Sequence, residues 1–198
     1  ANTILNSSEA GKVGQQHYIR LVDVFLPVET ISPLEPTGVS RLHLRPEKNH
    51  LEALLQRFFG HDSFREGQYE AIARALNFQD TVVLLPTGSG KSIVFQLASL
   101  LLPGTALVIC PLLALIKDQL RVLSAHGITR VGQISSMSSL EEKDAILDEL
   151  GQGLHRFCYI APERLQITQF REQLRSVSEK IGIALVVIDE AHCVSEWG

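Results

Sequence analysis

The chain has 198 residues, of which 45% are hydrophobic and 20% are charged. This composition is enough for one folded core, and it excludes low-complexity, collagen-like and wholly disordered chains. The 18 lysines and arginines are outnumbered by 22 aspartates and glutamates, so the net charge is -4. Because no overall positive field draws the chain to nucleic acid, any contact with nucleic acid must be local.

Two features of the sequence predict where the protein works. The longest apolar runs, such as 184–188, are far shorter than the roughly 20 residues that a membrane-crossing helix needs. The three cysteines are odd in number and far apart, which is typical of buried free thiols in a reducing compartment. We therefore expect a cytoplasmic, intracellular protein without membrane contact.

Residues 1–49 differ in amino-acid composition from the rest of the chain. They begin with polar residues and contain Pro27, Pro33, Pro36 and Pro46. One stretch, 18–28, is strand-like, although its apolar residues do not alternate cleanly. We predict that 1–49 is an N-terminal extension or linker of unknown role, and that 50–198 forms the folded lobe.

The folded lobe shows alternating helix and strand signals. Apolar residues in 51–59 recur at helical spacing, and a second helix is predicted at 67–76. Such an alternation is typical of an α/β fold, in which helices cover both faces of a mainly parallel sheet. The predicted strands are 81–85, 106–110, 131–134, 156–160 and 183–188, and the predicted helices between them are 92–102, 112–125, 139–150 and 162–177.

Two details support the predicted helix starts. Ser138 and Ser139 precede Glu141 and Glu142 at the spacing of a capping box. Pro162 is suited to the first turn of a helix, where its missing N–H costs nothing. We therefore expect helices to begin close to these positions.

A glycine-rich loop, 86–92, lies between the predicted strand 81–85 and the next helix. Its glycines let successive N–H groups point at an anion, and the helix N-terminus adds a positive dipole end. Lys91 would add a charge near the β and γ phosphates of a nucleotide, and Ser92 would offer a hydroxyl to Mg²⁺. Leu85 stands where the longer phosphate-loop pattern has glycine, so the match is to its shorter form. The predicted phosphate-binding residues are Thr87, Gly88, Ser89, Gly90, Lys91 and Ser92.

The last predicted strand ends in Asp189-Glu190-Ala191-His192. Carboxylates at the carboxyl end of a parallel strand lie where open α/β folds keep their ligands. We predict that Asp189 holds Mg²⁺, directly or through water, and that Glu190 orients and activates the attacking water.

These two motifs together resemble the first motor lobe of superfamily 2 helicases of DEAH type, and neighbouring runs resemble the RecQ family of DNA helicases. The resemblance covers 50–198 and implies a RecA-like P-loop three-layer sandwich. The runs that carry it are 64–68 (motif 0), 111–119 (motif Ia), 159–165 (the stretch ahead of the acidic strand) and 193–198 (the opening of an aromatic-rich loop).

The resemblance also implies roles for single residues. Gln68 and Arg65 would contact adenine, and His61 stands where the family usually has an aromatic residue that stacks on the base. His192 would act with Lys91, Asp189 and Glu190 in catalysis by coupling the nucleotide site to DNA. The predicted nucleic-acid contacts are Lys117 and Gln119, which would contact the phosphates of a strand, and Trp197, which would stack on an unpaired base.

The function implied is that of the ATP-binding lobe of an ATP-dependent 3′-to-5′ DNA helicase in recombination and repair, with ATP and Mg²⁺ as cofactors. Its partners would be single-stranded DNA, duplex junctions and a second RecA-like lobe of the same full-length protein, and in a bacterium it would associate with the nucleoid. Because an arginine finger from the second lobe typically supplies about 10³ to 10⁵ in rate, we expect 1–198 alone to bind ATP but not to unwind DNA.

Two alternatives have different substrates or no catalysis. One keeps the fold but makes the protein an RNA-directed ATPase. The other is a non-catalytic interaction module that uses 1–49. The intact Lys91, Asp189 and Glu190 weigh against the second, and the oligomeric state stays open.

Overall fold

The computed structural model describes residues 3–4, 47–86 and 88–196. The chain divides into two compact units, 1–101 and 102–198. The strand expected at 18–28 lies outside the described residues, and the division at residue 49 stays a prediction. Among the described residues, no helix has the length and apolar character needed to cross a membrane.

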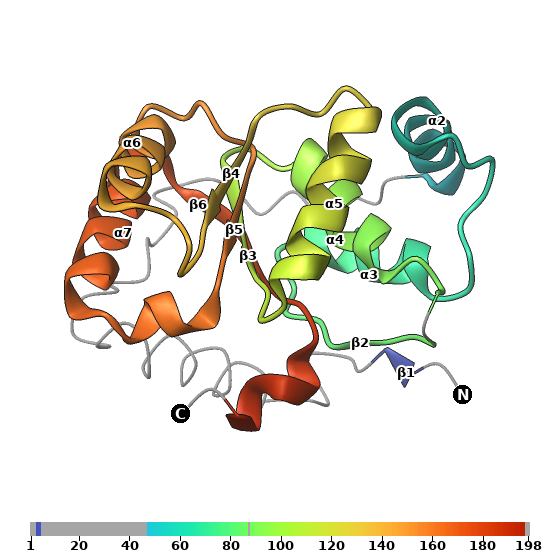
Figure 1. Cartoon of the computed structure of the whole chain (residues 1–198). Helices are drawn as coiled ribbons and strands as arrows, with labels where there is room; N and C mark the ends of the chain where they lie inside the picture. The colour runs from blue at the N-terminus through green and yellow to red at the C-terminus, as the bar shows by residue number, and fades with distance from the viewer. Residues whose placement is uncertain (1–2, 5–46, 87, 197–198) are drawn as a thin grey trace. The chain divides into compact units, whose positions relative to one another are not determined.

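In its described residues, 3–4, 47–86 and 88–101, the first unit has three helices and two short strands (Figure 1). The helix predicted at 51–59 is confirmed, and Leu51, Leu55 and Phe59 form its buried face. Gly60 ends it in the left-handed region, with its N–H donating to the Gln56 carbonyl. The elements are β1 (Thr3–Ile4), α2 (Lys48–Phe59), α3 (Gln68–Leu76), β2 (Val83–Leu84) and α4 (Lys91–Leu101).

The strand ahead of the phosphate loop differs from the prediction. The sequence suggested that 81–85 joins the parallel sheet, but β2 pairs antiparallel with β1, with Thr3 opposite Leu84. An apolar run predicts that a segment is extended, while its hydrogen-bond partner depends on other parts of the chain. Here residues 3–4 supply that partner.

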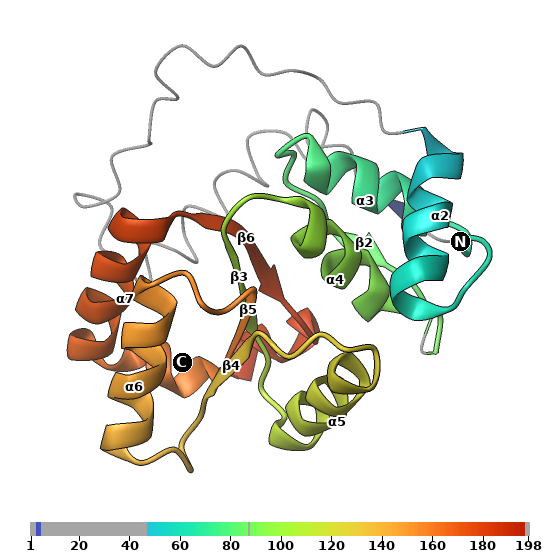
Figure 2. The same cartoon turned by 90° about the horizontal axis from the view of Figure 1, so that it is seen from above.

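The second unit is built on a four-stranded parallel sheet of order β4-β5-β3-β6. Figure 2 shows α5 on one face of this sheet and α6 with α7 on the other. The predicted α/β fold, with helices on both faces of a parallel sheet, is therefore confirmed. Its elements are β3 (Thr105–Ile109), α5 (Leu113–Ala125), β4 (Val131–Ile134), α6 (Leu140–Gly151), β5 (Phe157–Ile160), α7 (Thr168–Ile181) and β6 (Ile183–Ile188).

The core of the second unit centres on β5, whose four residues are fully buried. Side chains on both faces of this central strand pack under the helices, which is why the strand is apolar throughout rather than alternating. Tyr159 is the exception in polarity, since its side chain carries a hydroxyl into the core.

The helix predicted at 162–177 is two elements in the structure. A 3-10 helix, η2 (Pro162–Gln166), comes first, and Pro162 lies in its first turn as expected. Ile167 is extended, with φ -84° and ψ 115°, and so separates η2 from α7. A second 3-10 helix, η3 (Ala191–Glu196), follows β6.

The capping box at the start of α6 is formed by Ser139 and Glu142. The Ser139 hydroxyl accepts the Glu142 N–H at 3.1 Å, and the Glu142 carboxylate accepts the Ser139 N–H at 2.8 Å. Two N–H groups that the helix leaves unpaired are thereby satisfied. This confirms the helix start predicted from the spacing.

Replacing Ser139 by alanine should lower the free energy of unfolding by about 1 kcal/mol, because one capping acceptor is lost. Urea unfolding of the two proteins measures this difference. Ser136→Ala, an exposed serine ahead of the helix, is the matched control and should have almost no effect. Equal losses in both variants would contradict the role of the cap.

Candidate nucleotide and nucleic-acid site

The phosphate loop leaves β2 and enters α4, and its backbone is shaped by two glycines. Gly88 and Gly90 have φ of +77° and +79°, a region that other residues rarely adopt. The Lys91 ammonium donates to the carbonyls of Leu85 at 3.1 Å and Pro86 at 3.4 Å. The positive charge of Lys91 thus lies against the loop, while Thr87 lies outside the described residues.

The polar groups of the loop fit a phosphate chain. The Ser89 hydroxyl is buried and, within the described part of the chain, has no hydrogen-bond partner. A buried hydroxyl of this kind is costly unless a ligand or water satisfies it. Ser92 stands half-buried in the first turn of α4, where a hydroxyl beside a phosphate is placed to meet a divalent cation.

Two side chains hold the loop backbone, that of Arg65 just before α3 and that of Gln68 at its first position. Gln68 is only 2% exposed, and its amide donates to the carbonyls of Ser89 at 2.9 Å and Gly90 at 3.0 Å. Its oxygen accepts the Arg65 N–H at 2.9 Å, and the Arg65 guanidinium donates to the Gly88 carbonyl at 2.5 Å. These residues, predicted as adenine contacts, therefore also fix the shape of the phosphate loop.

A cavity of about 480 Å³ lies beside this loop in the first unit. Its volume falls within the range typical of small-molecule sites. The three predicted adenine contacts line it together with two glycines of the phosphate loop. The lining residues are Gly60, His61, Asp62, Ser63, Arg65, Gln68, Gly88, Gly90 and Ile93.

The acidic pair follows β6 in the second unit. The Asp189 N–H donates to the Ile109 carbonyl, which continues the pairing of β6 with β3. Glu190 then adopts a φ of +51°, an uncommon conformation for glutamate that typically costs about 1 to 3 kcal/mol and clusters at functional sites. Its carboxylate lies 3.2 Å from the His192 ring, so these two predicted catalytic residues are in contact.

Gln119 contacts Asp189 of the acidic pair. Its amide donates to Asp189 Oδ2 at 2.8 Å and accepts from the Tyr159 hydroxyl at 2.8 Å. The sequence suggested that Gln119 contacts a nucleic-acid strand, whereas the structure places its amide against Asp189. Tyr159 has no predicted role, although a tyrosine in a fully buried strand indicates a hydroxyl that needs a partner.

A cysteine lies near the same carboxylates. The pKa of the Cys110 thiol is raised to about 11, mainly by burial and further by the negative charges of Asp189 and Glu190, while a hydrogen bond with the Leu112 backbone lowers it in part. The thiol therefore stays protonated at neutral pH and is a poor nucleophile.

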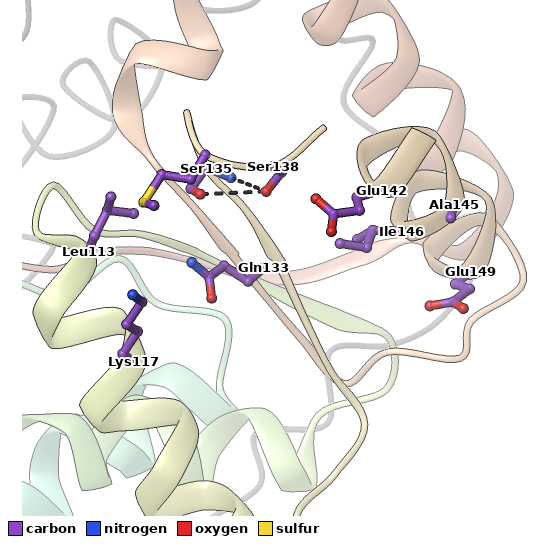
Figure 3. Close-up of a pocket in the computed structure, with 10 residues that line it drawn as sticks. Leu113, Lys117, Gln133, Ser135, Ser138, Glu142, Ala145, Ile146 and Glu149 are labelled. Atoms are coloured by element: carbon purple, nitrogen blue, oxygen red, sulfur yellow. Dashed lines mark hydrogen bonds between the residues drawn. The ribbon is translucent and has the colours of Figure 1, made fainter. Parts of the chain in front are cut away.

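A second cavity, of about 440 Å³, lies between α5, the end of β4 and α6 (Figure 3). Lys117 reaches it from α5 and Gln133 from β4, while Glu142 and Glu149 line it from α6. The Ser138 hydroxyl accepts the Ser135 N–H at 3.1 Å within the same cavity. Lys117, which is predicted to contact a nucleic-acid strand, thus lines a recess of mixed polar and apolar character. Trp197 lies outside the described residues.

Replacing Gly90 by alanine should cost about 1 to 2 kcal/mol more stability than replacing Gly88. Both residues have positive φ, but a Cβ at Gly90 would lie 2.8 Å from the Gln68 amide nitrogen, whereas nothing lies within 4 Å at Gly88. The added methyl would displace the buried amide from its two carbonyl partners. Thermal unfolding of both variants measures the difference, and equal stabilities would argue against Gln68 as the support of the loop.

Comparison with known proteins adds independent findings. The family model described as DEAD/DEAH box helicase matches residues 65–198. "Probable ATP-dependent DNA helicase RecS" of Bacillus subtilis is 42% identical over 75% of this chain and 29% of its own length. ATP-dependent DNA helicase RecQ of Haemophilus influenzae is 40% identical over 77% of this chain and 24% of its own length. The chain thus spans between about a quarter and a third of these curated relatives.

Proposed function

Because the chain belongs to the DEAD/DEAH box helicase family, we propose that it is the ATP-binding lobe of an ATP-dependent 3′-to-5′ DNA helicase of RecQ type. The observation that carries this proposal is the cavity beside the phosphate loop, which gathers His61, Arg65 and Gln68. The names of the similar proteins support DNA as the substrate. Coupling of ATP hydrolysis to strand separation in recombination and repair follows from that assignment.

The adenine ring is assigned to this cavity. Arg65 is exposed at its wall and presents a planar guanidinium that stacks on or hydrogen-bonds to a base. His61 offers the face of its imidazole ring for stacking on the base. The Gln68 amide carries both a donor and an acceptor, which match the adenine edge once one of its backbone contacts is exchanged for the base.

The phosphates are assigned to the loop, where Gly88 and Gly90 would offer backbone N–H groups and Lys91 supplies a positive charge. The Ser89 N–H donates to the Pro86 carbonyl at 3.2 Å, so the proposed contact of Ser89 is its buried hydroxyl. Thr87 belongs to the same proposed set. Mg²⁺, when bound, neutralises charge on the transferring phosphoryl group, and Ser92 and Asp189 are the proposed ligands. Ser92 offers a hydroxyl at the start of α4. Asp189 offers a carboxylate whose oxygens keep lone pairs available for a cation.

The hydrolytic step is assigned to Glu190. Its carboxylate accepts a proton from the attacking water or orients that water in line with the γ phosphorus. His192 lies 3.2 Å away from this carboxylate and is placed to sense its charge, which suits a residue that couples the nucleotide to the bound strand.

Nucleic acid is assigned to the face that carries the second cavity. Lys117 points into it with Gln133, and the two serine hydroxyls are further donors for a phosphate group (Figure 3). Trp197 is proposed as a stacking face for an unpaired base. The whole protein would act inside the cell on single-stranded DNA and duplex junctions, together with a second RecA-like lobe.

Glu190→Gln in the full-length protein should keep ATP affinity while lowering the rate of ATP hydrolysis by about 10² to 10⁴-fold, because the amide cannot accept the proton. Steady-state hydrolysis and binding of a fluorescent ATP analogue measure the two effects. Lys91→Ala is the contrasting variant and should lose affinity itself. Hydrolysis at the native rate in Glu190→Gln would contradict the assignment of Glu190 as the general base.

Lys117→Ala should weaken binding of single-stranded DNA and reduce the slope of log affinity against log salt by about 0.7, the amount expected for one lost phosphate contact. Lys180→Ala, an exposed lysine on α7, is the control, since Figure 2 shows α7 on the opposite face of the sheet from α5. An unchanged slope in Lys117→Ala would remove this lysine from the interface. Stimulation of hydrolysis by RNA but not DNA would favour an RNA-directed motor.

A further inference from the structure

Both ends of the Gln119 amide are used, and their chemistry fixes its orientation. The amide nitrogen donates to Asp189 Oδ2 and the amide oxygen accepts from the Tyr159 hydroxyl, each at 2.8 Å. Turning the amide over would set its oxygen against a carboxylate oxygen, so that two acceptors would face each other. The Tyr159 side chain is fully buried, so the hydroxyl that holds the amide oxygen is itself fixed in place.

The Asp189 carboxylate is held at both of its oxygens by neutral donors. Oδ1 accepts the Glu190 N–H at 3.1 Å, while Oδ2 accepts from Gln119. Each oxygen of a carboxylate has two lone pairs, so both retain acceptor capacity. A neutral donor leaves the negative charge uncompensated, whereas a lysine or arginine at residue 119 would compete with a cation for it.

The position of Gln119 on α5 separates it from the strand contact proposed on the same helix. Lys117 and Gln119 are two residues apart, which is about 200° around an α-helix. Lys117 lines the cavity between α5 and α6, while Gln119 meets the ends of β5 and β6. The amide is therefore directed at the carboxylate and not at the recess proposed for nucleic acid.

We infer that Gln119 is a positioning residue for the divalent cation: it fixes the Asp189 carboxylate in its binding orientation, and Tyr159 in turn fixes Gln119. This inference rests on the proposed function, in which Asp189 is a ligand of Mg²⁺. Hydrogen-bond partners of metal ligands typically contribute about 10 to 100-fold to metal affinity or activity. If the hydrogen bonds of Gln119 only joined α5 to the sheet, they would contribute to the stability of the fold and not to metal affinity.

The test is a binding measurement on the full-length protein. The affinity for a non-hydrolysable ATP analogue is measured with Mg²⁺ and with EDTA. The ratio of these two affinities, here called the gain from Mg²⁺, reports how strongly nucleotide and cation bind together. Gln119→Met keeps the length and helix propensity of the side chain but removes the donor and the acceptor. It should leave the affinity in EDTA unchanged and reduce the gain from Mg²⁺ by about 10-fold or more.

Tyr159→Phe removes only the hydroxyl and should reduce the gain from Mg²⁺ in the same direction by a smaller factor. It carries the test alone if Gln119→Met does not fold. Arg121→Gln, on an exposed part of the same helix, is the matched control and should keep the native gain.

The outcomes separate this inference from the function on which it rests. A native gain from Mg²⁺ in both Gln119→Met and Tyr159→Phe, even with lowered thermal stability, would overturn the positioning role. Asp189→Asn is measured beside them. If Asp189→Asn also keeps the full gain, Asp189 is not a ligand of Mg²⁺, and both the proposed site and the inference fail.

Discussion

The hydrogen bonds from the buried Gln68 amide to the phosphate loop are the constraint on which the first unit depends. Two glycines in the left-handed region give that loop a shape that few residues adopt, and an isolated loop of this kind has many other conformations. The amide accepts one backbone N–H and donates to two carbonyls, so it ties the loop to the start of α3. Since the same side chain lines the adjoining cavity, the shape of the loop and the wall of the cavity are set together.

In the second unit, the register of the parallel sheet determines where the acidic pair, Asp189 and Glu190, lies. Pairing of β6 with β3 continues through the Asp189 N–H, which brings the acidic pair to the carboxyl edge where Gln119 of α5 reaches it. Helix α5 therefore carries Lys117, which lines the second cavity, and Gln119, which contacts Asp189, on different sides. Glu190 adopts its uncommon conformation at the point where the strand gives way to η3, and such conformations cluster at functional sites.

Local and periodic features could be predicted from the sequence, and pairings between distant residues could not. The apolar spacing of α2 and the capping box at Ser139 depend on residues a few positions apart, and both are confirmed. The alternation of strands and helices is also read from neighbouring segments of the chain, and it is typical of a parallel sheet. The partner of β2 and the contact of Gln119 with Asp189, 70 residues away, depend on tertiary folding. The break at Ile167 was missed because a 3-10 turn and an α-helix share similar residue preferences.

The proposed function requires that the cavity and the phosphate loop bind an adenine nucleotide. The most direct measurement is a titration of the full-length protein with fluorescent ATP and GTP analogues in Mg²⁺, comparing the native sequence with Gln68→Ala and Lys91→Ala. We expect tighter binding of the ATP analogue, weaker binding in both variants, and a loss of the preference for adenine in Gln68→Ala. Equal affinity for the two analogues, or native affinity in a folded Lys91→Ala protein, would contradict it.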